Sequence, residues 1–83
     1  MTNKRLILYS RTYCHLCDDM LAALQELRGE CGFQVAVVDV DADPVLEEQY
    51  NERVPVLTTE DGREICHYFL DVAKLRETLG CIG

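Results

Sequence analysis

The order of apolar segments in the first forty residues constrains the fold of this chain more than any other feature. Leu6 to Ser10 opens with consecutive apolar side chains, as in a strand that is covered on both faces. From about His15 to Arg28, apolar residues form one stripe of a helix, and Gly29 is placed to end it. Phe33 to Val40 is rich in β-branched residues and predicts a second strand. Such a strand–helix–strand unit requires parallel strands joined by a right-handed crossover.

The second half of the chain predicts a short helix and a hairpin. Asp43-Pro44 marks a helix start, with Asp as the cap and Pro in the first turn, and this helix stops near Asn51. Two strands, Val54 to Thr59 and Arg63 to Tyr68, flank the turn Glu60-Asp61-Gly62.

Asp71 is placed to cap a last helix, which Gly80 ends. On this helix we expect Val72, Leu75 and Leu79 to face inward. The complete order is β-α-β-α-β-β-α, which predicts an α/β fold with a four-stranded mixed sheet. Two helices should cover one face and the third helix the other. The 83 residues predict a single domain over 1–83.

Charge and hydropathy exclude several partners. Eight Lys and Arg stand against fifteen Asp and Glu, a formal charge of −7. Nucleic acids and anionic membranes attract basic surfaces, so we expect neither as a partner.

The N-terminal segment does not resemble a signal peptide. A signal peptide needs an apolar run of roughly 7–15 residues, and the run Leu6-Ile7-Leu8 is shorter than that. We therefore expect a cytoplasmic protein, in a compartment that keeps structural thiols reduced. We also expect a monomer.

Five cysteines are the chemically notable residues, at positions 14, 17, 31, 66 and 81. Cys14 and Cys17 fall at the start of the first predicted helix, where unpaired N–H groups and the helix dipole favour a thiolate. Their spacing allows a disulfide, so the pair predicts redox chemistry, with Cys14 attacking and Cys17 resolving. Arg11 could stabilise the thiolate, whereas Asp18 and Asp19 oppose it.

The remaining cysteines and the residues around the pair leave alternatives open. We interpret Cys31 and Cys81 as incidental thiols and Cys66 as strand packing. The C-x-x-C pair is also half of a zinc site, but Cys66-His67 is the only other candidate pair, and adjacent strand residues point to opposite faces.

Two other positions near the pair are informative. Val54-Pro55 could hold a cis bond, although a simple proline at the start of a strand is the more common arrangement. Tyr13, directly before Cys14, could flank a substrate or simply pack.

The stretch YSRTYCHLC, the later Val54-Pro55 dipeptide and the element order together resemble the glutaredoxins of the thioredoxin superfamily. The small bacterial glutaredoxin-like proteins in which C-H-L-C is followed by Asp are especially similar. The resemblance implies a thioredoxin fold and a thiol–disulfide oxidoreductase of cell redox homeostasis. It implies Cys14 as nucleophile, Cys17 as resolving thiol and Pro55 as a cis-proline beside them. The backbone of Val54 would pair with a bound peptide or glutathione, and Arg11 stands where glutaredoxins often have Lys.

The chain also departs from the glutaredoxin pattern. Many glutaredoxins carry C-P-Y-C, T-V-P and a glycine pair that receives glutathione before the last helix. Here His15-Leu16 separates the cysteines, Arg53 replaces the Thr, and Tyr68-Phe69-Leu70 precedes Asp71. These side chains would obstruct an approach of ligand to backbone that Gly permits. Asp71 could accept the amine of glutathione, or serve as a helix cap alone.

These observations predict a dithiol–disulfide oxidoreductase without a bound cofactor, with glutathione as a candidate co-substrate. Its partners would be a disulfide-containing protein or a glutathione mixed disulfide, and a reductase or glutathione as electron donor. Two alternatives remain: a zinc or iron–sulfur binding module, and a redox-inactive adaptor that uses the Val54-Pro55 edge for protein recognition.

Overall fold

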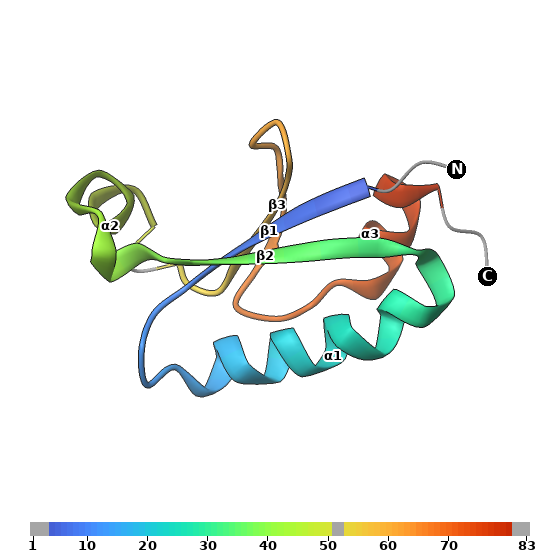
Figure 1. Cartoon of the computed structure of the whole chain (residues 1–83), viewed down its shortest axis with the longest axis horizontal. Coiled ribbons are helices and arrows are strands. Elements are labelled where there is room, and N and C mark those ends of the chain that lie inside the picture. Colours follow the sequence, from blue (N-terminus) through green and yellow to red (C-terminus); the bar gives the residue numbers. More distant parts are fainter. Residues whose placement is uncertain (1–3, 51–52, 81–83) are drawn as a thin grey trace.

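The computed structural model describes residues 4–50 and 53–80. Seven of the elements match the predicted order, and a short 3-10 turn precedes the second α-helix (Figure 1). The elements are β1 (Lys4–Ser10), α1 (His15–Cys31), β2 (Phe33–Asp39), η1 (Val40–Ala42), α2 (Pro44–Tyr50), β3 (Val56–Thr59), β4 (Glu64–His67) and α3 (Val72–Leu79). The sheet order is β2-β1-β3-β4, with β1 parallel to β2 and the other pairs antiparallel. The predicted four-stranded mixed sheet is confirmed.

The register of the sheet brings three chain segments to one end. Tyr9, next to the carboxyl end of β1, pairs with Val56, the first residue of β3. Val56 in turn pairs with His67, the last residue of β4. The segment after β1, the segment before β3 and the segment after β4 therefore meet at the same end of the sheet.

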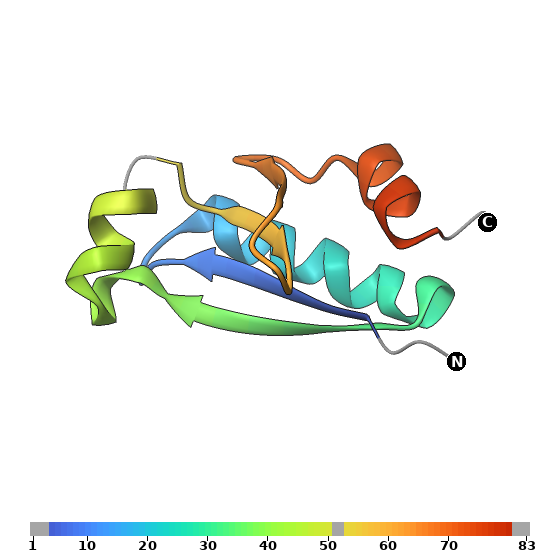
Figure 2. The same ribbon diagram turned by 90° about the horizontal axis from the view of Figure 1, so that it is seen from above.

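The hydrophobic core lies on one face of the sheet, between the strands and the helices α1 and α3 (Figure 2). Leu6 and Leu8 point into it because alternate residues of β1 share a face. The buried members of the core are Leu6, Leu8, Met20, Leu24, Phe33, Leu57, Ile65, Leu75 and Leu79. On the opposite face, the ring of Tyr50 in α2 stacks on Tyr9, with 4.3 Å between ring centroids. Helices α1 and α3 cover one face, as predicted. The predicted cover of the other face by the third helix is incomplete, because α2 meets that face only at one end and buries no residue.

The predicted end of α1 at Gly29 is wrong. The helix continues to Cys31, and Gly32 ends it in the left-handed conformation, with φ of 63°. The N–H of Gly32 donates to the carbonyl of Arg28 over 3.0 Å. Inside a helix Gly costs about 1 kcal/mol relative to Ala, which does not stop a helix that packs on a core. The extra turn lets Cys31 pack against the core.

The strands and the last helix also differ in detail from the prediction. Both hairpin strands are shorter, because Val54 and Pro55 precede β3 and Tyr68 follows β4. The turn after β3 is as predicted, and the N–H of Gly62 donates to the carbonyl of Thr59. Val72 is 40% exposed, so its predicted inward position is wrong: it is the first residue of α3 and lies at the edge of the packed face.

Candidate active site

Cys14 and Cys17 form a disulfide at the start of α1, as their spacing predicts. Their Cα atoms are 5.2 Å apart, within the range that a disulfide spans. Cys14 is the N-cap of α1, and the N–H of Cys17 donates to the sulfur of Cys14 over 3.1 Å. A sulfur in this position accepts from the exposed N–H groups of the first turn, an environment that favours negative charge.

The two sulfurs differ in their access to solvent. Cys17 is 4% exposed, whereas Cys14 is half-buried. An attacking thiolate must meet its reaction partner, while a second thiol needs to reach only its neighbour. The difference in burial therefore fits the predicted order, with Cys14 first and Cys17 second.

The bond between Val54 and Pro55 is cis. The sequence alone favoured a simple proline at a strand start, and that interpretation is wrong; the cis bond implied by the glutaredoxin resemblance is present. Pro55 is completely buried, and its carbonyl accepts from the N–H of Tyr68 over 2.9 Å. Val54, half-buried, lies just before β3 and hence at the same end of the sheet as the segment that carries Cys14.

Arg11 is held by a carboxylate from a distant part of the sequence. Its guanidinium makes two contacts with Asp41 in η1, at 2.8 and 3.4 Å. The hydrogen bond to this carboxylate raises the pKa of Arg11. The sequence predicted a role for Arg11 beside the thiolate and did not reveal this partner, because thirty residues separate the two side chains.

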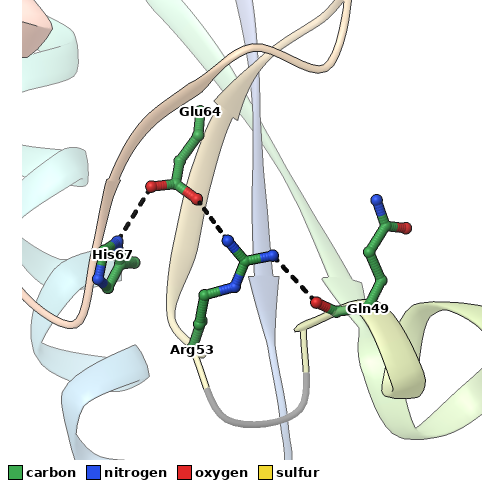
Figure 3. A network of polar contacts seen from close by, with 4 residues as sticks. All are labelled: Gln49, Arg53, Glu64 and His67. Atoms are coloured by element: carbon green, nitrogen blue, oxygen red, sulfur yellow. Dashed lines mark hydrogen bonds and ion pairs between the residues drawn. The ribbon is translucent and has the colours of Figure 1, made fainter.

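Arg53 belongs to a network that sequence reasoning missed (Figure 3). It donates to Glu64 over 3.4 Å and to the carbonyl of Gln49 over 3.1 Å. Glu64 also pairs with the Nδ1 atom of His67 at 3.0 Å, and Arg53 lies 5.7 Å from the ring centre of Tyr50. These contacts tie the segment before Val54 to both α2 and β4. No local sequence signal predicts them, since the partners of Arg53 come from two elements, α2 and β4.

The aromatic residue before Cys14 is fully exposed. Tyr13 has 100% of its surface accessible, so its interpretation as a packed aromatic is wrong and the substrate-flanking role remains a prediction. The segment after β4 supplies two more exposed rings, Tyr68 and Phe69.

Of the predictions for the other cysteines, the one for Cys66 is confirmed and the one for Cys31 is wrong. Cys66 is a free thiol that packs against the core, as predicted, and burial raises its pKa. Cys31 is disulfide-bonded, so its interpretation as an incidental thiol is wrong. The prediction for Cys81 lies outside the described residues.

The described residues lack both a group of metal-binding side chains and a membrane-spanning helix. Within 4–50 and 53–80, no three side chains of His, Cys, Asp or Glu are grouped so that they could hold a metal ion. No helix in the same residues has the length and apolar character needed to cross a membrane.

The fold and the position of the cysteine pair define a thioredoxin-fold protein. Thioredoxin 1 of Thermosipho africanus is similar, with a TM-score of 0.62 at 19% identity, over 92% of this chain and 90% of that one. More specifically, the chain belongs to the glutaredoxin-like domain family (DUF836), whose profile matches residues 5–80.

Relatives with higher sequence identity come from bacteria. A protein of Nitrosomonas europaea, solved in solution by NMR, is 37% identical with a TM-score of 0.85, over 94% of this chain and 93% of that one. A protein of X. campestris, solved by X-ray crystallography, is 38% identical with a TM-score of 0.73, over 94% and 99%. An uncharacterized protein of Mycobacterium tuberculosis is 32% identical over 92% of this chain and 82% of its own length.

Proposed function

We propose that this protein is a dithiol–disulfide oxidoreductase of cell redox homeostasis. The observation that carries the proposal is the Cys14–Cys17 disulfide at the N-terminus of α1, in which the second sulfur is buried and the first is accessible. Family membership and the thioredoxin fold support the same chemistry.

In the proposed reaction, the reduced protein transfers two electrons to a substrate disulfide. The thiolate of Cys14 attacks one substrate sulfur, the substrate S–S bond breaks, and the other substrate sulfur leaves as a thiolate that takes a proton from water. Cys17, deprotonated, then attacks the Cys14 sulfur of the mixed disulfide and expels the second substrate thiol. The products are two substrate thiols and the Cys14–Cys17 disulfide that the structure contains.

The reduced form is restored by an external donor, either two glutathione molecules or a dithiol reductase. We propose no bound cofactor, with glutathione as a candidate co-substrate and a protein disulfide or glutathione mixed disulfide as the oxidised partner. The backbone of Val54, half-buried before β3, is the proposed hydrogen-bonding partner of the bound substrate. The reaction requires a reducing compartment, and we propose that a monomer acts there in the cytoplasm.

Disulfide reduction with NADPH tests the proposal, using glutathione and its reductase in one assay and thioredoxin reductase in the other. Wild type should be active in at least one assay, and Cys14→Ser should be inactive in both. Cys17→Ser should accumulate a mixed disulfide on Cys14, visible by mass spectrometry. Cys66→Ser is the matched control, because it removes a half-buried thiol of a different segment, and it should keep wild-type activity.

A Cys14→Ser variant as active as wild type would refute the proposal. So would stoichiometric zinc or iron in protein purified under anaerobic conditions, if that metal were lost in both cysteine variants. Binding of a partner that survives both substitutions, in a wild type without reductase activity, would favour an adaptor instead.

A further inference from the structure

Three exposed aromatic rings adjoin the candidate active site, and we call them the aromatic rim: Tyr13, Tyr68 and Phe69. Their exposed fractions are 100%, 39% and 71%. Single exposed apolar side chains are common on protein surfaces, but exposed apolar side chains that gather beside one site favour a binding role. The rim therefore calls for an explanation that the disulfide chemistry does not supply.

The backbone holds two members of the rim in a conformation that non-glycine residues rarely adopt. Tyr13 and Tyr68 have φ of 63° and 64°, in the left-handed region. A non-glycine residue in this conformation destabilises the fold by of order 1 kcal/mol. Such a conformation is kept only where contacts with the surrounding structure hold the backbone in place. For Tyr68 the fixing contact is its N–H, which donates to the carbonyl of Pro55. The position that follows β4 thus carries a ring even though glycine would relieve the backbone.

The rim and the disulfide share one end of the sheet. Tyr13 directly precedes Cys14, and Tyr68 and Phe69 follow the last residue of β4, whose partner Val56 pairs with Tyr9. Figures 1 and 2 both show the connection from β4 to α3 beside the first turns of α1. A disulfide that reaches Cys14 is therefore close to aromatic surface on more than one chain segment.

Charge at this end of the molecule disfavours an anionic reactant. The cationic side chains of Arg11 and Arg53 are already paired with Asp41 and Glu64. Additional carboxylates extend from the first turns of α1, from the last residue of β2 and from the segment after it: Asp18, Asp19, Asp39 and Asp43. Oxidised glutathione carries a net negative charge at neutral pH, so it meets repulsion here. A neutral or basic peptide with apolar side chains is complementary to both the charge and the rings.

We propose that the aromatic rim selects its substrate: a disulfide in a protein segment with an apolar side chain beside the half-cystine and no acidic residues. This inference rests on the proposed oxidoreductase function and names the substrate class of the same site. The apolar side chain is buried against Tyr68 and Phe69 while the sulfur is presented to Cys14. Small anionic disulfides such as oxidised glutathione react poorly by comparison.

The experiment compares reduced protein with four disulfides. Three are blocked hexapeptides, each as a mixed disulfide with 2-mercaptoethanol, in which the cysteine is flanked by Leu, by Ser or by Glu. The fourth is oxidised glutathione. Rates are measured by acid quench and mass spectrometry, and each is divided by the same protein's rate with hydroxyethyl disulfide, a small neutral reference. The variants are Phe69→Ser and Tyr68→Gly, and the control is Val45→Ser, since Val45 is 68% exposed on α2.

We expect the Leu peptide to react about fivefold faster than the Ser peptide, which corresponds to partial burial of one leucine side chain. The Glu peptide and oxidised glutathione should be slowest. Phe69→Ser and Tyr68→Gly should each reduce the preference for Leu over Ser, and Val45→Ser should preserve it. Equal wild-type rates for the Leu and Ser peptides, fastest reaction with oxidised glutathione, or an undiminished preference in both rim variants would overturn this inference alone. Absence of reaction with every disulfide, the reference included, would overturn the proposed function and this inference with it.

Discussion

Substitution of Asp71 tests whether its carboxylate binds the amine of glutathione or only caps α3. Its carboxylate accepts from the N–H of Lys74 over 3.0 Å, and its carbonyl accepts from the N–H of Leu75 over 2.9 Å. The side chain is therefore the N-cap of α3, a helix of eight residues that buries Leu75 and Leu79 in the core. We predict that capping accounts for the whole effect of Asp71 and that the carboxylate charge has no part in binding a ligand amine.

The geometry gives the expected size of each substitution. Asp71→Ala removes the acceptor for one helix N–H and should cost about 1 kcal/mol of unfolding free energy. For a chain of this size that loss lowers the Tm by about 4–8 °C. Asp71→Asn retains an oxygen in the capping position, and Asn and Asp are nearly equal caps, so it should cost no more than about 0.5 kcal/mol.

Urea denaturation of the three proteins, all with the Cys14–Cys17 disulfide intact, measures the stabilities. The rate of reaction with oxidised glutathione, measured on the reduced proteins, supplies the second readout. Asp71→Asn should match wild type in this rate. If Asp71→Asn keeps the stability but loses most of the rate with oxidised glutathione while its rate with hydroxyethyl disulfide is unchanged, the carboxylate binds the ligand and our reasoning is wrong. Equal destabilisation by Asn and Ala would instead refute the capping argument.

Three further predictions follow from burial and charge. Leu24 is completely buried, so Leu24→Ala should cost about 2–5 kcal/mol in urea unfolding, whereas Val45→Ala on the exposed side of α2 should stay within about 0.5 kcal/mol; equal losses would contradict the assigned core. Burial raises the pKa of Cys66, so at pH 8 a smaller fraction is thiolate than in the unfolded chain. Iodoacetamide should therefore modify Cys66 more slowly in the native protein than in urea, as peptide mass mapping would reveal, and equal rates would show that the thiol is not buried. The side chains of the Arg11–Asp41 pair are about one-third exposed, so solvent and salt should screen their attraction. A double-mutant cycle with Arg11→Met and Asp41→Asn should therefore give a coupling energy below about 1 kcal/mol that falls with added salt. A larger coupling energy that does not depend on salt would contradict the screening.

The sequence predicted the types of the elements well because each carries a local signal. The apolar stripe of α1 and the Asp71 and Gly80 boundaries of α3 depend on residues close together in the chain. The end of α1 was mispredicted between two glycines, Gly29 and Gly32. Both can end a helix, and α1 continues to Cys31, which packs against the core and is disulfide-bonded. A local sequence pattern does not contain such tertiary contacts.

In the candidate site too, features set by neighbouring residues could be predicted, whereas contacts between distant segments could not. The spacing of Cys14 and Cys17 is local, and it predicted their disulfide. The partners of Arg11 and Arg53 come from segments that are distant in the chain and are brought together by the sheet, so no local pattern favours Asp41 or Glu64 as a partner. The cis bond before Pro55 was implied by family resemblance rather than by residue preference, since most prolines follow a trans bond.

The topology explains why the chemistry and the specificity of this site can be separated. The crossover from β1 to β2 places the cysteine pair at the carboxyl end of β1, because α1 must start there to return along the sheet. The antiparallel register then brings the segment before β3 and the segment after β4 to that end, whatever side chains they carry. Arg53, Tyr68 and Phe69 lie in these two segments and are exposed, outside the buried core. If the proposed disulfide reaction is correct, exposed positions in these two segments are the ones at which proteins of this architecture would differ in substrate.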